Sequence, residues 1–206
     1  MEKLLLVNPD GMLNGLTASK IDCHKGDGLL HKAFLVTVYD NHERLLLTRR
    51  SPNKELWAGY WDGSVASHVL ERDLDGSPKQ GYINAARRRI PQELGISLKD
   101  LIYMDEFLYK AIDPNKKASD EVRVEYEICA VIFAYYSTEL GDINPNTEEI
   151  SDIRWVTRKS LLNAVDNTSR NPYTPWFRYS LLLNEILRYQ NAKIEGRCFD
   201  FTHLTP

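Results

Sequence analysis

The sequence predicts an α/β or α+β sandwich, in which a β-sheet packs against helices. Three observations indicate this class. The first half of the chain is rich in β-forming segments, one segment of helical composition lies near the middle, and two more helical segments come late. Runs of strands with separate helices are typical of layered domains built around one sheet.

Turn residues bound the expected strands. Asn8-Pro9-Asp10-Gly11 follows the first strand, and Asp40-Asn41 separates the second from the third, which is typical of a hairpin. The β-rich runs predict strands at residues 4–7, 34–39, 44–48, 103–110, 122–136 and 153–156.

Helices are expected at residues 83–94, 158–164 and 176–190. Gly95 follows the first helix where a stop is expected, and Pro91 should distort or interrupt that helix because proline lacks an amide N–H. The polar segment 140–149 predicts a flexible loop. The last helix would pack through an apolar face made of Trp176, Tyr179, Leu183, Ile186 and Leu187.

The composition indicates one globular domain. The chain has 206 residues and is 43% hydrophobic, which is enough for one sizeable core, and no Gly/Ser/Pro-rich linker divides it. We therefore expect a single domain over residues 1–206.

Charge and cysteine usage limit the partners and the compartment. The net charge of −3 favours neither a nucleic acid nor an anionic membrane as partner. Cys23, Cys129 and Cys198 are odd in number and far apart, which argues for a reducing compartment. The N-terminal apolar run is too short for a signal peptide, and no segment approaches the ~20 apolar residues of a membrane span. We expect a cytoplasmic monomer or homodimer.

Three histidines and two glutamates predict a metal site. His24 and His31 flank a glycine-containing loop, and His68 ends the run that begins at Trp61. Glu125 and Glu127 lie two residues apart in a β-rich run and therefore share one face of the strand. Two like charges on one face repel, and a divalent ion such as Mn, Mg, Fe or Zn removes that cost. Each residue taken alone is more simply a surface residue, so the hypothesis depends on the whole set.

Two basic clusters predict a binding site for a phosphate-bearing ligand. Arg49, Arg50 and Lys54 surround the turn after an expected strand, and residues 87–89 are three consecutive arginines. Guanidinium and ammonium groups are the partners that a diphosphate prefers. A solvated basic surface is the alternative, because consecutive helical residues point in different directions.

A series of segments, spread from about Lys20 to about Trp176, resembles one known family in order and spacing. The segments are Lys20 with His24 and His31, Leu30-His31-Lys32-Ala33-Phe34, Thr48-Arg49-Arg50 with Lys54, Trp57-Ala58-Gly59-Tyr60-Trp61, the run from Arg87 to Ile96, the run from Tyr109 to Pro114, Glu125-Tyr126-Glu127, and Thr174-Pro175-Trp176. They resemble the type I isopentenyl-diphosphate isomerases, which belong to the Nudix superfamily. The resemblance implies a Nudix-type sandwich with a mixed sheet flanked by helices.

The resemblance also implies roles for single residues. A divalent metal (Mg, Mn or Zn) would be held by His24, His31, His68, Glu125 and Glu127. A second Mg ion, bridging the diphosphate of the substrate, would be held by Glu93 with the backbone carbonyl of Ala66. The diphosphate would be clamped by Lys20, Arg50, Lys54 and Arg89. Glu127 would protonate a C=C bond, Tyr109 would orient it, and the π face of Trp176 would stabilise a carbocation. Trp176 as a plain core residue of its helix is the alternative.

The sequence departs from the family at one catalytic position. The family uses a glutamate for one proton transfer and a cysteine for the other, and Ala66 stands where that cysteine is expected. Alanine has no proton to transfer, so isomerisation would be weak or atypical. Ser67 would point to the other face of an extended segment, and Cys129 is no obvious substitute.

The Nudix hydrolase pattern is degraded as well. Of its three clustered glutamates only Glu93 remains, because Arg89 and Gln92 occupy the other two positions and Gln80 occupies the upstream glutamate position. Fewer carboxylates hold fewer Mg ions, which disfavours a standard nucleoside-diphosphate hydrolase.

Three functions therefore remain open. The first is an enzyme acting on isoprenoid diphosphates by protonation of a C=C bond. The second is a diphosphatase acting on prenyl or nucleoside diphosphates, and the third is a diphosphate-binding protein without turnover. Glu127 and Tyr109 favour the first over the third, since acid geometry is not needed merely to hold a metal.

Overall fold

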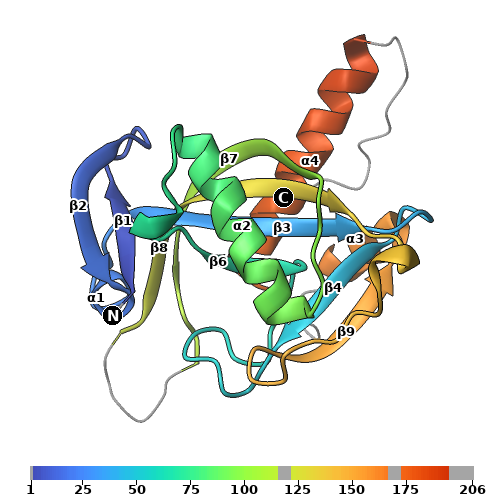
Figure 1. The fold of residues 1–206 in the computed structure, drawn as a ribbon, viewed down its shortest axis with the longest axis horizontal. Helices are drawn as coiled ribbons and strands as arrows, with labels where there is room; N and C mark the ends of the chain where they lie inside the picture. The colour runs from blue at the N-terminus through green and yellow to red at the C-terminus, as the bar shows by residue number, and fades with distance from the viewer. Residues whose placement is uncertain (1, 116–121, 167–172, 195–206) are drawn as a thin grey trace.

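The computed structural model describes residues 2–115, 122–166 and 173–194 (Figure 1). Its strands are β1 (Lys3–Val7), β2 (Leu13–Ser19), β3 (His31–Tyr39), β4 (Leu45–Arg50), β5 (Trp61–Asp62), β6 (Val65–His68), β7 (Leu101–Ile112), β8 (Val124–Tyr135) and β9 (Ile150–Val156). Its helices are α1 (Lys20–Cys23), α2 (Pro78–Leu94), α3 (Arg158–Asp166) and α4 (Pro175–Ile194), with single 3₁₀ turns at Glu71–Asp73 and Thr138–Leu140. In the described part of the chain, no helix is long and apolar enough to cross a membrane.

Strand β3 is the centre of a mixed sheet. It pairs in parallel with β8 along its whole length and antiparallel with β6. Strand β7 continues the sheet beyond β8, while β9 and β5 both pair with β4. The N-terminal hairpin of β1 and β2 joins at the start of β3 through the pair Leu6 and His31. The expected mixed sheet is confirmed.

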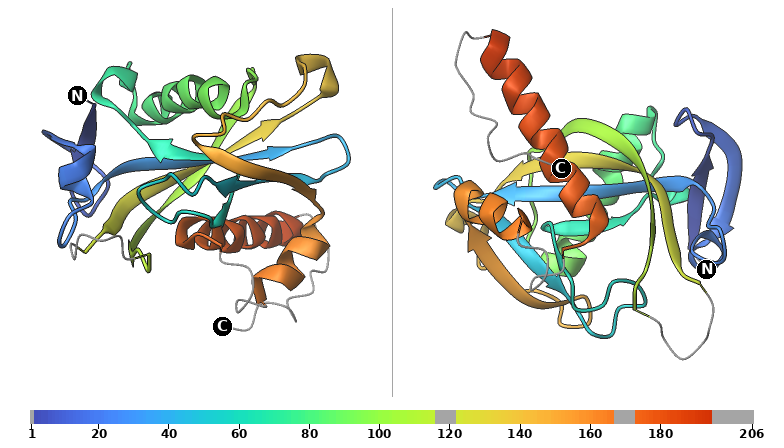
Figure 2. Two further views of the ribbon diagram at one scale, coloured as in Figure 1. Left: turned by 90° about the horizontal axis from the view of Figure 1, so that it is seen from below. Right: turned by 180° about the vertical axis from the view of Figure 1, so that it is seen from behind.

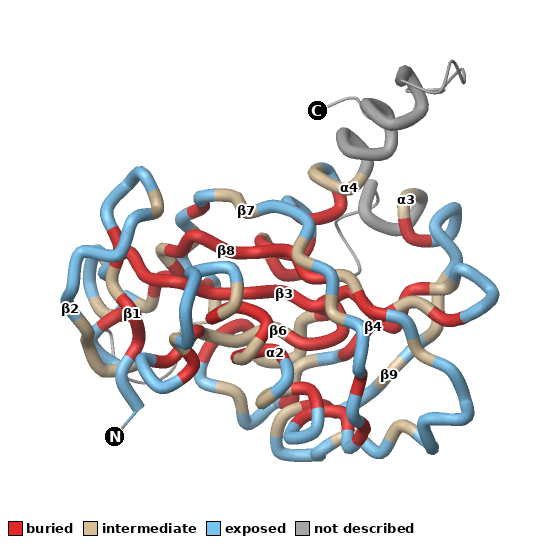
Figure 3. The backbone as a smooth tube through the Cα atoms, turned by 45° about the horizontal axis from the view of Figure 1, so that its top comes forward, coloured by how far each residue is buried: buried red, intermediate tan, exposed pale blue. Residues whose placement is uncertain are grey.

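Helices cover both faces of this sheet. Figure 2 shows α2 on one face and α3 and α4 on the other. Successive residues of β3 therefore enter different cores: Phe34 and Val36 pack with Ile90 of α2, and Leu35 packs with Phe177 of α4. Because both faces are covered, β3 is buried along almost its whole length, as Figure 3 shows.

Helix α2 differs from the sequence expectation at its N-terminal end and in its continuity through Pro91, whereas it ends at Leu94 as expected. It begins at Pro78, where Ser77 caps it by accepting a hydrogen bond from the amide of Gln80, and it runs through Pro91 to Leu94. The expected interruption at Pro91 is wrong. Proline removes one intrahelical hydrogen bond, but Pro91 lies in the last turn, and the neighbouring Ile90 and Leu94 are fully buried. Gly95 ends the helix at φ +71°.

The packing face of α4 also differs from the expected one. Trp176, Phe177, Ser180 and Leu181 are buried, whereas Tyr179 is 50% exposed. Trp176 is thus buried as predicted, but the face continues through Phe177 and Leu181 rather than through Tyr179. The small Ser180 lies between these two residues in the sequence, and its hydroxyl donates to the carbonyl of Phe177. The side chains of Ile186 and Leu187 lie outside the described residues.

Four short elements were not expected from the sequence. They are β2, β5, β6 and α1. Three of them have four residues or fewer, which is too short for a periodic hydrophobic pattern. They matter because β6 carries His68 and α1 leads directly into His24.

The loop between His24 and His31 depends on a glycine. Gly28 has φ +73°, and a Cβ atom there would lie 2.3 Å from Cγ1 of Val124, at the start of β8. Gly26 has φ +57° and no heavy atom of the described residues within 4 Å of its Cβ position. Both glycines have a positive φ, which would be strained for any other residue, but only Gly28 is packed against β8.

This contrast predicts different stabilities for two alanine variants. Gly26→Ala should lower the free energy of unfolding by about 1 kcal/mol through backbone strain alone. Gly28→Ala should lower it by about 1–3 kcal/mol more, because the new methyl group overlaps Val124. Urea unfolding of both variants measures the difference. Equal losses would show that the loop accommodates the methyl group and is not held against β8.

Candidate active site

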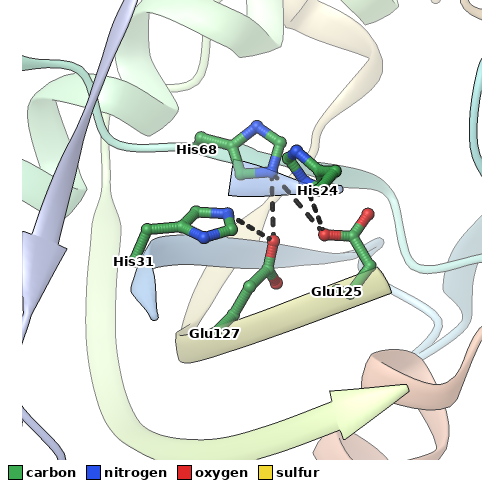
Figure 4. A group of neighbouring side chains, drawn as sticks. All are labelled: His24, His31, His68, Glu125 and Glu127. Atoms are coloured by element: carbon green, nitrogen blue, oxygen red, sulfur yellow. Dashed lines mark hydrogen bonds and ion pairs between the residues drawn. The ribbon is translucent and has the colours of Figure 1, made fainter. Parts of the chain in front are cut away.

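Strand register brings together the residues predicted as metal ligands. His31 of β3 is paired with Glu127 of β8, and His68 of β6 is paired with Ala33, two residues after His31. Paired residues in neighbouring strands project to the same face. Glu125 lies two residues before Glu127 and projects to that face as well. Figure 4 shows the resulting cluster.

His24 reaches the cluster from α1 rather than from the sheet. Ser19 caps this short helix by accepting a hydrogen bond from the amide of Asp22, and His24 is the C-cap residue that follows Cys23. The carbonyl of His24 then accepts a 3.0 Å hydrogen bond from the amide of Val124. This bond fixes His24 beside the strand that carries the two glutamates.

The five side chains surround one point. His24 Nε2 lies 2.8 Å from Glu125 Oε2. His31 Nε2 and His68 Nε2 lie 3.3 and 3.0 Å from Glu127 Oε1. One potential ligand atom from each residue lies within 4.8 Å of all the others. Among the described residues, the cluster therefore has the composition and spacing of a site for one metal ion.

The protonation of two imidazoles is set by the backbone. His24 Nδ1 lies 2.5 Å from the carbonyl of Lys20, and His31 Nδ1 lies 2.7 Å from the carbonyl of Leu29. A carbonyl only accepts hydrogen bonds, so each Nδ1 carries a proton and each Nε2 points inward, where it can act as a metal ligand. Both Nε2 atoms and Glu125 Oε2 are buried without a hydrogen-bond partner among the described residues. Inward-pointing nitrogens facing carboxylates fit a divalent cation.

Burial and neighbouring charges shift the pKa values of this cluster in opposite directions. Burial alone would raise the pKa of Glu125, but His24 and then His68 hold it well below its usual value. Burial would lower the pKa of His24, and the carboxylate of Glu125 outweighs it and raises that pKa. Burial lowers the pKa of His68. The cluster thus favours an ionised Glu125, a state that a bound cation would stabilise.

Glu127 is also in contact with a phenol. Tyr109 of β7 is paired with Glu127 of β8, and the Tyr109 hydroxyl donates a short hydrogen bond to Glu127 Oε2. Burial and then the charge of Glu127 raise the pKa of Tyr109 well above its usual value. Tyr109 therefore remains a hydrogen-bond donor and fixes the orientation of the carboxylate.

Trp176 is both a core residue and a wall of the site. It is 4% exposed, and its ring lies 6.1 Å from that of Tyr109. Its indole N–H donates to the carboxylate of Asp62, 2.8 Å from one oxygen and 3.0 Å from the other. The Arg50 guanidinium lies over the indole ring, 5.3 Å from its centroid. Both interpretations of Trp176 thus describe the same side chain.

Asp62 is an anchor that sequence analysis missed. Its buried carboxylate also accepts from the Thr174 hydroxyl at 2.9 Å and lies 3.4 Å from a nitrogen of Arg50. Burial raises the pKa of Asp62, and Arg50 opposes that shift. Asp62 follows Trp61 in a two-residue strand, so no periodic pattern marked it.

Trp57 supports Trp176 from the side and has a strained backbone. The two indole rings meet edge to face, with centroids 5.2 Å apart. Trp57 has φ +47°, a region that bulky residues rarely adopt, and its amide donates a 2.9 Å hydrogen bond to the buried Asp113. This contact fixes the aromatic wall to the end of β7.

The predicted diphosphate residues line one cavity of about 180 Å³ next to the cluster. Its lining includes Lys20, Arg50, Lys54 and Arg89, together with Glu125, Glu127, Tyr109 and Trp176. Arg88 lines it too, and pairs with Asp73 at 2.7 Å. The structure thus brings the four basic residues to one place, on the side of the predicted acid.

Besides Arg50, which pairs with Asp62, two of these basic residues share a carboxylate partner. Glu149 accepts a 2.9 Å hydrogen bond from Arg89 and a short one from Lys54. Glu93, predicted to hold a second Mg ion, accepts from the same Arg89 at 2.7 Å, and burial raises its pKa. Glu149 was not predicted, because it lies in the polar segment 140–149 that was expected to be a flexible loop. The amide of Asn146 in this segment donates to the carbonyl of Glu93 at 2.9 Å, which ties the segment to α2.

Among the described residues, Cys129 is the one thiol that lines the cavity near Ala66. Ala66 and Ser67 both line the cavity, but Ser67 is paired with Phe34, whose side chain packs on the α2 face. Cys129 lines the cavity, but burial raises its pKa well above the usual value. Cys23 and Cys129 are free thiols, and Cys198 lies outside the described residues.

Comparison with known proteins defines the class of this fold. A model of the NUDIX domain matches residues 29–177. Among solved structures, DR0079 from Deinococcus radiodurans has a TM-score of 0.61 at 19% sequence identity, and the match covers 91% of this chain and 98% of that one. The chain therefore belongs to the NUDIX family, and the predicted sandwich is confirmed.

Curated relatives narrow the class further. The chain is 32% identical over 188 residues to the isopentenyl-diphosphate Delta-isomerase of Haloarcula marismortui, with 89% of this chain and 91% of the relative covered. It is 32% identical over 207 residues to the protein of the same name from Escherichia coli O1:K1, with 98% of both chains covered. Within the NUDIX proteins, the chain is thus a member of the isopentenyl-diphosphate Delta-isomerase family of isomerase-like enzymes.

The cluster predicts stabilisation by a divalent metal. At a metal concentration about 100-fold above the dissociation constant, Mn²⁺ or Zn²⁺ should raise the free energy of unfolding by about 2.7 kcal/mol. Glu125→Gln should remove most of this gain, and lowering the pH through the histidine range should weaken it because protons compete for the same nitrogens. Thermal unfolding with and without metal measures both effects.

His42→Gln is the matched control, because His42 is an exposed histidine in the β3–β4 turn. It should respond to metal as the unchanged protein does. An unchanged protein that does not respond, or a Glu125→Gln variant with the full response, would contradict a metal site at this cluster.

Proposed function

We propose that this protein is a metal-dependent enzyme that protonates the C=C bond of an isoprenoid diphosphate. Its reaction would be the interconversion of isopentenyl and dimethylallyl diphosphates, with a weak or atypical second proton transfer. The observation that supports this proposal most strongly is the meeting of three features at one cavity. These are the five-residue cluster, the contact of Tyr109 with Glu127, and the four basic residues.

Basic residues of the cavity would bind the diphosphate, and acidic residues would hold the metal ion and transfer the proton. Lys20, Arg50, Lys54 and Arg89 would bind the diphosphate through charge-assisted hydrogen bonds. A divalent ion (Mg, Mn or Zn) held by the cluster would neutralise the two carboxylates and fix the position of Glu127. Glu127 Oε1 faces two histidines, which leaves Oε2, beside the Tyr109 hydroxyl, as the atom that can hold the proton to be transferred.

In the second proton transfer, this chain differs from the family that it resembles. An isomerase must also remove a proton from the substrate, and Ala66 has no group that can accept one. Ser67 lies on the opposite face of β6, and the raised pKa of Cys129 disfavours its thiolate. The proposed enzyme therefore keeps the acid and the clamp but lacks an evident second base.

The alternative functions have less support. A hydrolase would require more carboxylates along α2, and Arg89, which stands at one expected glutamate position, forms an ion pair with the remaining Glu93. A binding protein without turnover would not require a buried phenol that orients a carboxylate.

The proposal predicts slow isomerisation that depends on Glu127. Incubation with isopentenyl or dimethylallyl diphosphate, with Mg²⁺ and Mn²⁺ in deuterated water, should give interconversion and deuterium incorporation. Glu127→Gln should reduce both by about 10² or more. Glu55→Gln is the control, since Glu55 is exposed and lines the same cavity without belonging to the cluster. Release of free phosphate would favour the diphosphatase, and no reaction would favour the binding protein.

The missing thiol predicts a gain of function. Ala66→Cys should raise the isomerisation rate, because general acid–base groups contribute about 10²–10⁴-fold and a partly misplaced thiol still contributes. Product analysis with both substrates measures the change, and Ala66→Ser is the comparison variant of similar size. Fast isomerisation by the unchanged protein would contradict the view that position 66 limits the reaction.

A further inference from the structure

Glu149 lies where a ligand of the basic residues would lie. Its two carboxylate oxygens are shared between Lys54 and Arg89, and its side chain is only 22% exposed. Both basic residues line the cavity together with Glu149 itself. An internal carboxylate thus already makes the contacts that are proposed for the diphosphate.

The position of Glu149 is set by the backbone on both sides. Its carbonyl accepts a 2.9 Å hydrogen bond from the amide of Ser51, and its own amide donates at 2.9 Å to the carbonyl of Asn146. Strand β9 begins at the next residue and pairs with β4, the strand that carries Arg50. Withdrawal of the whole segment would break these bonds, so the carboxylate can leave the basic residues only by side-chain rotation.

The charges around Glu149 balance. Lys54 and Arg89 carry two positive charges, and Glu149 and Glu93 carry two negative charges when ionised. Lys54 and then Arg89 outweigh the effect of burial and lower the pKa of Glu149 to about 2, so Glu149 is ionised near neutral pH. A diphosphate without metal would have to compete with this carboxylate and would be repelled by it.

We propose that Glu149 is a specificity-determining residue that competes with the ligand for Lys54 and Arg89, so that the site favours a diphosphate carrying a divalent cation over a metal-free polyanion. A cation between the carboxylate and the diphosphate turns their repulsion into attraction. Glu149 then faces the metal while Lys54 and Arg89 turn to the phosphate oxygens. The inference rests on the proposed function, because it concerns the diphosphate site of that reaction.

The test is calorimetric binding of inorganic diphosphate to the full chain, first with a chelator and then with Mg²⁺. In the chelator, Glu149→Gln should bind diphosphate about tenfold tighter or more than the unchanged protein, because two basic residues are released. Addition of Mg²⁺ should tighten binding to the unchanged protein more than binding to Glu149→Gln. The chelator empties the histidine cluster equally in both proteins, so it does not affect the comparison.

Glu148→Gln is the matched control. Glu148 is the preceding residue, is exposed, and accepts from the Asn53 amide at 3.3 Å rather than from the basic residues. It loses the same charge and should keep the affinity of the unchanged protein. Glu149→Ala serves as a second variant if the glutamine variant does not fold.

The outcomes separate this inference from the proposed function. If diphosphate binds with Mg²⁺ and the Glu149 variants show unchanged affinity in the chelator, the role of Glu149 is overturned and the clamp stands. A gain in Glu148→Gln equal to that in Glu149→Gln would also overturn it, since net charge alone would then explain the effect. If diphosphate binds to none of the proteins in either condition, the clamp and the role of Glu149 both fail.

Discussion

The structure depends most on the burial of two carboxylates and three imidazoles around one point. Removing such groups from water costs several kcal/mol for each charged group, unless partners compensate for the lost hydration. Here the partners are fixed before any ion arrives, because two backbone carbonyls set the imidazole protons and Tyr109 holds one carboxylate. Four of the five side chains are buried, which keeps them largely out of contact with water. The same arrangement that makes the cluster costly when empty makes it selective for a cation.

A second polar anchor supports the aromatic side of the cavity. Asp62 links the indole of Trp176 to the guanidinium of Arg50, so the residue proposed to face a carbocation and a residue proposed to bind the diphosphate share one buried carboxylate. A carboxylate that accepts from an indole N–H also makes the ring face more negative, which strengthens its attraction for a cation. The strained backbone of Trp57, held by Asp113, completes this wall. The proposed diphosphate site and the proposed carbocation site are therefore connected through buried carboxylates and not through the sheet alone.

The sequence was informative where residues of a suitable chemical type also follow the alternation of a strand or the order of the elements. Glu125 and Glu127 could be placed on one face from strand alternation, and the sandwich followed from the order of the elements. Asp62 and Glu149 could not be found in this way. Asp62 lies in a strand of two residues, and Glu149 becomes important only because long-range pairing places it against Lys54. On α4, Trp176 is buried as predicted, but Tyr179 is exposed and Ser180 is buried instead. A small polar serine gives no apolar signal, so the pattern of apolar residues did not mark this side of the helix.

The parallel pairing of β3 with β8 has a consequence for how the protein folds. These strands form the middle of the sheet, yet everything from residue 40 to residue 123 lies between them in the chain. Contacts of such high sequence separation incur a large loop-closure entropy and form slowly. His31 and Glu127 meet only when this pair has formed, so a partly folded chain that lacks it has no complete ligand set. Binding of a metal ion by this set would therefore be a late event in folding, and it would slow unfolding.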